Sequence, residues 1–85
     1  MQTAQDILNR IRWDQQFAAG AEFKVGYYDR VDRVIIRIAF KDIRFPEGEH
    51  FAFEIVDDNE DVHSIPYHRV REIYRNGRLI WRREH

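Results

Sequence analysis

The sequence contains no cysteine among its 85 residues. Without thiols the chain can form neither a disulfide framework nor a thiolate metal site, and this absence fits a reducing compartment. No apolar run approaches the roughly 20 residues that a membrane-spanning helix needs. The first ten residues, MQTAQDILNR, are polar and lack the apolar segment of a secretory signal. The sequence therefore predicts a cytoplasmic protein without a membrane partner.

Glycine and proline are also scarce, with four and two residues. The glycines are scattered, so the sequence shows no glycine-rich phosphate loop, and it contains no internal repeat or low-complexity segment. Hydrophobic residues make up 44% of the chain, which favours a folded globule over disorder. A chain of this length is enough for one domain, and we expect residues 1–85 to form it.

Positive charge is sparse over most of the chain and concentrated at its end. Residues 1–67 carry eight basic and thirteen acidic side chains, whereas residues 68–85 carry six arginines and two glutamates. The acidic residues cluster between Glu47 and Asp61, where no lysine or arginine occurs. Arginine outnumbers lysine twelve to two, and its planar guanidinium suits phosphate groups and aromatic rings. A GC-rich genome explains the same bias equally well.

Helical periodicity is confined to the N-terminal part. Thr3 followed by Asp6 resembles a capping box, and apolar residues then recur at helical spacing, which predicts a helix over Thr3–Arg12. We expect Trp13 and Phe17 to close this helix against the rest of the protein. The small residues of Ala18–Glu22 predict a loop.

After this loop the hydrophobic period changes from 3.6 to 2, which is typical of half-buried strands. The expected strands are Phe23–Tyr28, Arg33–Phe40, Phe51–Val56 and Val62–Ile65, with polar turns between them. One helix followed by about six short strands predicts an α+β fold. In so small a chain we expect the helix to pack on a curved, barrel-like and mostly antiparallel sheet.

The last two expected strands, Arg69–Arg75 and Arg78–Arg83, flank Asn76-Gly77. This dipeptide is a strong signal for a type I′ hairpin turn, because both central residues need positive φ. The segment His68–Tyr74 also fits a helical turn, which is the alternative to the first of these strands.

A two-residue turn predicts the register of this hairpin, with Arg75 opposite Arg78 and Arg71 opposite Arg82. One face then carries Arg71, Ile73, Arg75, Arg78, Ile80 and Arg82, and the other, expected to be core, carries Val70, Glu72, Tyr74, Leu79 and Trp81. Like charges opposite one another are destabilising, and an anionic ligand would relieve the conflict. The alternative is a solvated face, or one that the acidic segment Glu47–Asp61 neutralises.

The histidines show no metal-ligand spacing, so we expect neither a metal nor another cofactor. For His50 and His63 we expect structural roles. His68 differs because it adjoins Arg69 at the start of the basic hairpin. An imidazole N–H and a guanidinium placed there can bind one phosphate together.

Three stretches together resemble the RNA cyclic group end recognition domain family. They are ILNRIRWDQQF (Ile7–Phe17), VGYYDR (Val25–Arg30) and IPYHRVREIYRNGRLIWRR (Ile65–Arg83), and they stand in the order of the family. Between Asp32 and Asp61 only the hydrophobic pattern matches. The resemblance implies non-catalytic recognition of RNA ends that carry a 2′,3′-cyclic phosphate, linked to RNA repair or processing enzymes.

The resemblance also implies a set of site residues. The phosphate-binding set comprises Tyr28, Arg30, His68, Arg69 and Arg71, to which the hairpin adds Arg75, Arg78 and Arg82, with Trp13, Asp14, Asp29 and Trp81 in supporting roles. Tyr28 or Trp81 would stack on the terminal base. The alternatives are core packing for both tryptophans and a turn cap for Asp29.

Two other functions remain open at the level of sequence. The acidic segment and the basic hairpin of two copies would suit a protein-interaction module, with the chain as a monomer or weak homodimer. A phosphodiesterase acting on cyclic ends would need a second acid or base near His68.

Overall fold

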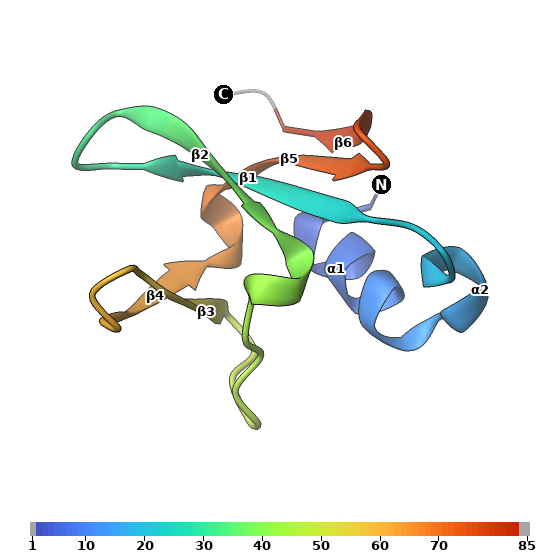
Figure 1. The fold of residues 1–85 in the computed structure, drawn as a ribbon, viewed down its shortest axis with the longest axis horizontal. Coiled ribbons are helices and arrows are strands. Elements are labelled where there is room, and N and C mark those ends of the chain that lie inside the picture. The colour runs from blue at the N-terminus through green and yellow to red at the C-terminus, as the bar shows by residue number, and fades with distance from the viewer. Residues whose placement is uncertain (1, 84–85) are drawn as a thin grey trace.

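The computed structural model describes residues 2–83. The elements, in chain order, are α1 (Ala4–Trp13), α2 (Gln15–Ala18), β1 (Phe23–Asp29), β2 (Val34–Ala39), the 3₁₀ turn η1 (Phe40–Asp42), β3 (Ala52–Val56), β4 (Val62–Pro66), the 3₁₀ turn η2 (Tyr67–Arg69), β5 (Val70–Arg75) and β6 (Arg78–Arg82) (Figure 1). None of the described helices is long and apolar enough to cross a membrane.

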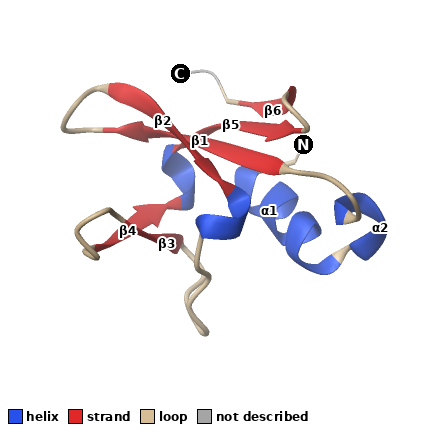
Figure 2. Ribbon diagram, viewed as in Figure 1, coloured by secondary structure: helices blue, strands red, loops and turns tan. Residues whose placement is uncertain are grey.

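The strands form two antiparallel sheets. One has four strands in the order β2-β1-β5-β6, and β3 pairs with β4 in a separate hairpin. Helix α1 and the small sheet lie on the same side of the four-stranded sheet, and the core lies between them (Figure 2). The predicted α+β class and N-terminal helix are confirmed. The strands divide into two sheets, so no closed barrel forms.

The capping box predicted at the start of α1 is present. The Asp6 N–H donates to Thr3 Oγ1, and the Thr3 N–H donates to Asp6 Oδ2. The loop predicted over residues 18–22 is wrong at its start, because a short second helix reaches Ala18. Asp14 begins that helix by accepting the N–H groups of Gln16 and Phe17. A helix of four residues is too short to show a hydrophobic period.

The core joins both sheets to α1. Its largest fully buried side chains are Leu8, Val25, Phe53, Val70 and Ile73. A row of neighbouring aromatic rings runs from Phe17 through Phe23, Phe40, Phe45 and Phe53 to Tyr67. Tyr67 is the first residue of η2, so this row links the core directly to the turn that precedes the basic hairpin.

The predicted hairpin turn is confirmed. Asn76 and Gly77 have φ values of 49° and 81°, as a type I′ turn requires. The Glu22 N–H donates to Asn76 Oδ1 at 2.8 Å, and the Asn76 N–H donates to the Glu22 carbonyl at 2.7 Å. These two bonds hold the hairpin tip against the start of β1.

The predicted register of the hairpin holds for two pairs next to the turn and is wrong beyond them. Arg75 lies opposite Arg78, but the register then shifts, so that Ile73 lies opposite Trp81. Ile80 is therefore an extra residue of β6. A second shift, between β1 and β5, makes Arg71 an extra residue of β5. These are β-bulges, which insert one unpaired residue and twist the strand.

The bulges change which side chains are buried. Ile73 and Val70 are both in the core although they are three residues apart. Leu79, predicted to be core, lies before the bulge and is 43% exposed, so the core side of the hairpin is the one that carries Ile73 and not the one that carries Leu79. The predicted division of the hairpin into an arginine face and a core face is therefore wrong. Trp81 does pack against the core, and its indole N–H donates to the Gln2 carbonyl.

The helical alternative for His68–Tyr74 is correct only at its first residues. A single 3₁₀ turn, η2, covers Tyr67–Arg69, and the extended conformation begins at Val70. The Val70 N–H donates back to the Tyr67 carbonyl and ends the turn.

Gly26 is the point at which two side chains meet across β1. It lies opposite Arg37 on β2 and Glu72 on β5. Arg37 Nε is 3.0 Å from Glu72 Oε1, so the ion pair passes over the glycine. A Cβ at position 26 would lie 2.8 Å from Glu72 Oε1 and 3.1 Å from Ile35 Cγ2. The absence of a side chain is what makes room for the pair.

We expect Gly26→Ala to lower the free energy of unfolding by about 1–3 kcal/mol, because the new methyl group displaces Glu72 and Ile35. Urea denaturation measures this. In a Glu72→Ala background the same substitution should cost much less, since the closest neighbour is then missing. An equal cost in both backgrounds would contradict this explanation.

Candidate nucleic-acid interface

Two hollows flank the turn η2, and its two basic side chains line different ones. His68 lines a hollow of about 490 Å³, which we call the histidine pocket, together with His50, Phe51 and Arg83. Arg69 lines a hollow of about 570 Å³ between the two sheets, which we call the inter-sheet hollow. The prediction that His68 and Arg69 bind one phosphate together does not match this arrangement.

The histidine pocket brings together residues that are distant in the sequence. Phe51 is 80% exposed, and His50 and His68 are also exposed. Gln5 donates from Nε2 to the His50 carbonyl at 3.0 Å, and the Tyr67 N–H donates to the Phe51 carbonyl at 2.9 Å. These bonds tie the segment that precedes β3 to α1 and to η2, which brings His50, Phe51 and His68 to one hollow.

Two guanidinium groups converge on the backbone beside this pocket. Arg71 Nη1 and Arg83 Nη1 both donate to the His68 carbonyl oxygen, at 2.7 and 2.6 Å. The Arg83 N–H also donates to the Arg71 carbonyl, which fixes the end of β6 against β5. A carbonyl group is a dipole without net charge, so it does not cancel the two positive charges. The arrangement therefore favours an anion at this edge of the molecule.

Arg71 connects the histidine pocket to the other face of the sheet. Its guanidinium carbon lies 5.8 Å from the centre of the Tyr28 ring, within the range of a cation–π contact. Tyr28 is half-buried near the end of β1. The chain of contacts thus runs from Tyr28 through Arg71 to the His68 carbonyl.

The inter-sheet hollow has a different composition. Arg69 shares it with His63, Ser64 and Asp29. His63 Nε2 is 2.7 Å from Asp57 Oδ2, and this hydrogen bond, followed by that of the Asp61 N–H, lowers the pKa of the Asp57 carboxyl. Asp29 lines this hollow and Asp57 binds its His63, whereas none of the described acidic residues lines the histidine pocket, so the inter-sheet hollow is the poorer anion site.

The family model of the MJ1316 RNA cyclic group end recognition domain matches residues 1–83. The chain belongs to this family. No solved structure matches it.

Several residues that the MJ1316 family resemblance implies have structural roles here. Asp29 Oδ1 accepts the N–H groups of Val31 and Asp32 and so caps the β1–β2 turn, in which Arg30 is exposed. Asp14 caps α2 and lies 3.5 Å from Arg10. These contacts explain both carboxylates without a ligand.

The two tryptophans differ from each other. Core packing, the alternative role for both, is correct for Trp81 but not for Trp13, which is 73% exposed. The guanidinium of Arg12 lies 4.8 Å from the Trp13 ring and 4.3 Å from the Phe45 ring. Trp13 is the last residue of α1, and its exposure places it outside the core.

The remaining hairpin arginines lie away from the histidine pocket. Arg75 and Arg78 face each other beside the turn, and Arg75 also lies opposite Phe23. Since β5 spans Val70–Arg75 at about 3.4 Å per residue, the two ends of the strand are about 17 Å apart. Arg82, on the edge strand β6, lies opposite Glu72, and alternation along the strand turns it to the face opposite Arg83.

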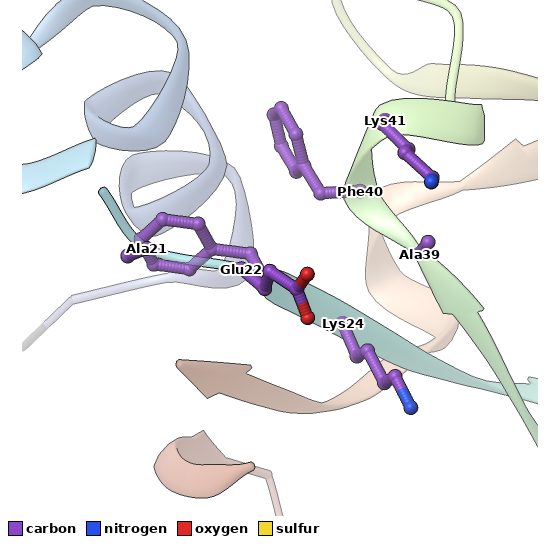
Figure 3. A pocket seen from close by; sticks show the side chains of 7 residues that line it. Ala21, Glu22, Lys24, Ala39, Phe40 and Lys41 are labelled. Carbon is purple, nitrogen blue, oxygen red and sulfur yellow. The ribbon is translucent and has the colours of Figure 1, made fainter. Parts of the chain in front are cut away.

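A further hollow of about 370 Å³ lies between the start of β1 and η1. Figure 3 shows Lys24 and Lys41 on its rim with the ring of Phe40 nearby. It contains neither histidine nor arginine, so it offers weaker phosphate chemistry than the histidine pocket. Among the described residues, no three histidine or acidic side chains are grouped to hold a metal ion.

The sequence did not single out three residues of the histidine pocket. His50 was expected to be structural, Phe51 to be the first residue of a strand, and Arg83 to be the end of the hairpin. Strand β3 begins at Ala52, so Phe51 stands outside the ladder and its ring faces solvent. No local pattern reveals this, because the alternation of Phe51, Phe53 and Ile55 is that of a strand.

Proposed function

We propose that this protein is an RNA-binding module that holds an RNA end with a 2′,3′-cyclic phosphate in the histidine pocket. The observation that carries the proposal is the grouping of His68, His50 and Arg83 around one hollow beside the exposed Phe51 ring. Membership of a family described by RNA cyclic group end recognition supports the same ligand class.

The chemistry of the pocket suits this ligand. A cyclic phosphate carries one negative charge and has no free 2′-hydroxyl, so it accepts hydrogen bonds and donates none at that position. Imidazole and guanidinium N–H groups are the matching donors. The terminal base of a single strand is unstacked, and stacking on an aromatic ring such as Phe51 contributes about 1–3 kcal/mol.

Arg83 replaces Arg69 as the expected partner of His68 on the phosphate. Arg69 lines the other hollow, whereas Arg83 lines the histidine pocket itself. Arg71 adds a second positive charge at the His68 carbonyl. The roles predicted for His68 and Arg71 are kept in this proposal, and Arg75 and Arg78 contribute only to the long-range attraction of RNA.

The two histidines also favour a second candidate function. A phosphodiesterase that opens the cyclic phosphate needs a general acid and a general base, and His50 and His68 line the same pocket. For either function the natural partner is an enzyme of RNA repair or processing, since such enzymes make or consume cyclic ends.

A titration with one short RNA ending in 2′,3′-cyclic phosphate, 3′-phosphate or 3′-hydroxyl tests the proposal. We expect the tightest binding for the cyclic end, with affinity falling as salt rises. Conversion of the cyclic end during the titration would establish the phosphodiesterase instead. Equal binding of all three RNAs would show that the pocket is only a nonspecific basic surface. The absence of binding would favour the protein-interaction module.

A further inference from the structure

The outer face of the four-stranded sheet, turned away from α1 and the small sheet, has the composition of a single-strand binding surface (Figure 2). Alternation along paired strands places one set of side chains on it. By register the polar and aromatic members of this set are Lys24, Tyr28, Arg37, Glu72, Tyr74 and Arg82, and the others are Gly26, Ile35, Ala39 and Leu79. We call this surface the sheet platform.

The charge of the sheet platform is mainly positive. Lys24, Arg37 and Arg82 lie on it, with Arg71 at its edge, and Glu72 is the acidic residue among them. Arg37 binds that carboxylate, whose side chain is 19% exposed, while the Arg37 side chain stays 52% exposed. The surface therefore presents cations to solvent and covers its one carboxylate, which is complementary to a phosphate backbone.

Two tyrosine rings on the platform each have an arginine beside them. The Arg37 guanidinium lies 5.9 Å from the centre of the Tyr74 ring, and that of Arg71 lies 5.8 Å from the Tyr28 ring. Tyr74 pairs with Lys24, four residues along β1 from Tyr28. At about 3.3 Å per residue this separates the rings by about 13 Å along the strand. The rings would therefore contact different nucleotides.

The platform is continuous with the histidine pocket. Tyr28 contacts Arg71, and Arg71 shares the His68 carbonyl oxygen with Arg83, which lines the pocket. A strand whose end occupies the pocket would pass over Tyr28 first and reach Tyr74 next. Open antiparallel sheets that carry aromatic and basic side chains bind single-stranded RNA in this manner.

We propose that the sheet platform binds the single-stranded nucleotides that precede the RNA end, with Tyr28 and Tyr74 stacking on separate bases. This inference rests on the proposed function, because the histidine pocket supplies the position of the end. It adds a length requirement that the pocket alone would not impose.

The test compares a two-nucleotide with an eight-nucleotide RNA, both ending in a 2′,3′-cyclic phosphate, on the wild-type chain and on variants. We expect the longer RNA to bind at least ten-fold tighter. Tyr74→Leu should weaken the longer RNA about five-fold or more and leave the shorter one unchanged, which also shows that the variant is folded. Lys24→Gln should weaken the longer RNA, whereas Lys41→Gln, which removes the same charge from η1, should not.

The outcomes separate this proposal from the proposed function. If the short RNA keeps its preference for the cyclic end but neither length nor Tyr74→Leu matters, the platform is refuted and the pocket stands. If the long RNA binds equally with a cyclic or a hydroxyl end and still depends on Tyr74, the platform stands and end recognition fails. An equal loss for both lengths in Tyr74→Leu would refute a separate platform.

Discussion

Replacing Arg83 by alanine is expected to weaken binding of a cyclic-phosphate RNA end about ten- to one-hundred-fold. The guanidinium lines the histidine pocket and binds the His68 carbonyl at 2.6 Å, so the variant loses a phosphate donor and a constraint on η2. A hydrogen bond to a charged group contributes about 1.5–3 kcal/mol, and 1.4 kcal/mol corresponds to a factor of ten. A fluorescence titration with the labelled RNA measures the change.

His68→Ala should cause a loss of similar size, because it removes the imidazole donor from the same pocket. Arg33→Ala is the matched control for Arg83→Ala, since it also deletes one arginine charge, here from the exposed β1–β2 turn. Its effect should stay within about two-fold at physiological salt, where charges beyond about 8 Å are largely screened. Equal losses for Arg83→Ala and Arg33→Ala would show that only net charge matters, which would exclude a defined end site.

Phe53→Ala is expected to lower the free energy of unfolding by about 3–5 kcal/mol. Phe53 has no exposed surface, and its ring centre lies 6.5 Å from that of Phe45 and 5.8 Å from that of Tyr67. A domain of 85 residues is stabilised by about 4–13 kcal/mol in total, so the substitution removes a large share of this stability. Urea denaturation followed by circular dichroism measures the change.

Phe51→Ala is the control for this prediction, because it removes the same side chain two residues earlier from a position that is 80% exposed. Its effect on the free energy of unfolding should stay within about 0.5 kcal/mol. We expect Phe51→Ala to change the free energy of RNA binding by more than it changes the free energy of unfolding, since Phe51 lies in the histidine pocket. Similar destabilisation by the two substitutions would contradict the assigned burial.

Features set by local interactions were predictable from the sequence. The capping box needs only Thr3 and Asp6, three residues apart, and the hairpin turn needs only Asn76 and Gly77 at positive φ. The strands followed from alternation with a period of two. The order of three motifs likewise sufficed to indicate the family, and the family model confirms it over residues 1–83.

The register of the sheet and the composition of the site were decided by tertiary structure. A bulge adds one residue to one strand, and the extra residues, Arg71 and Ile80, can be identified only against their partner strands. Each shift moves the side chains beyond it to the opposite face, which is why Val70 and Trp81 pack on the same side of the sheet as Ile73.

The composition of the histidine pocket and the role of Gly26 also could not be predicted from the sequence. Adjacent residues in η2 point to different hollows, so that His68 and Arg69 separate while His50 and Arg83 join His68 from other parts of the chain. Gly26 reads as an ordinary strand residue until Arg37 and Glu72 are seen to meet above it. The sequence by itself determined the elements and the family, because these depend on neighbouring residues and their order. Only the packed chain decided which side chains share a surface, because that depends on contacts between segments that the sequence keeps apart.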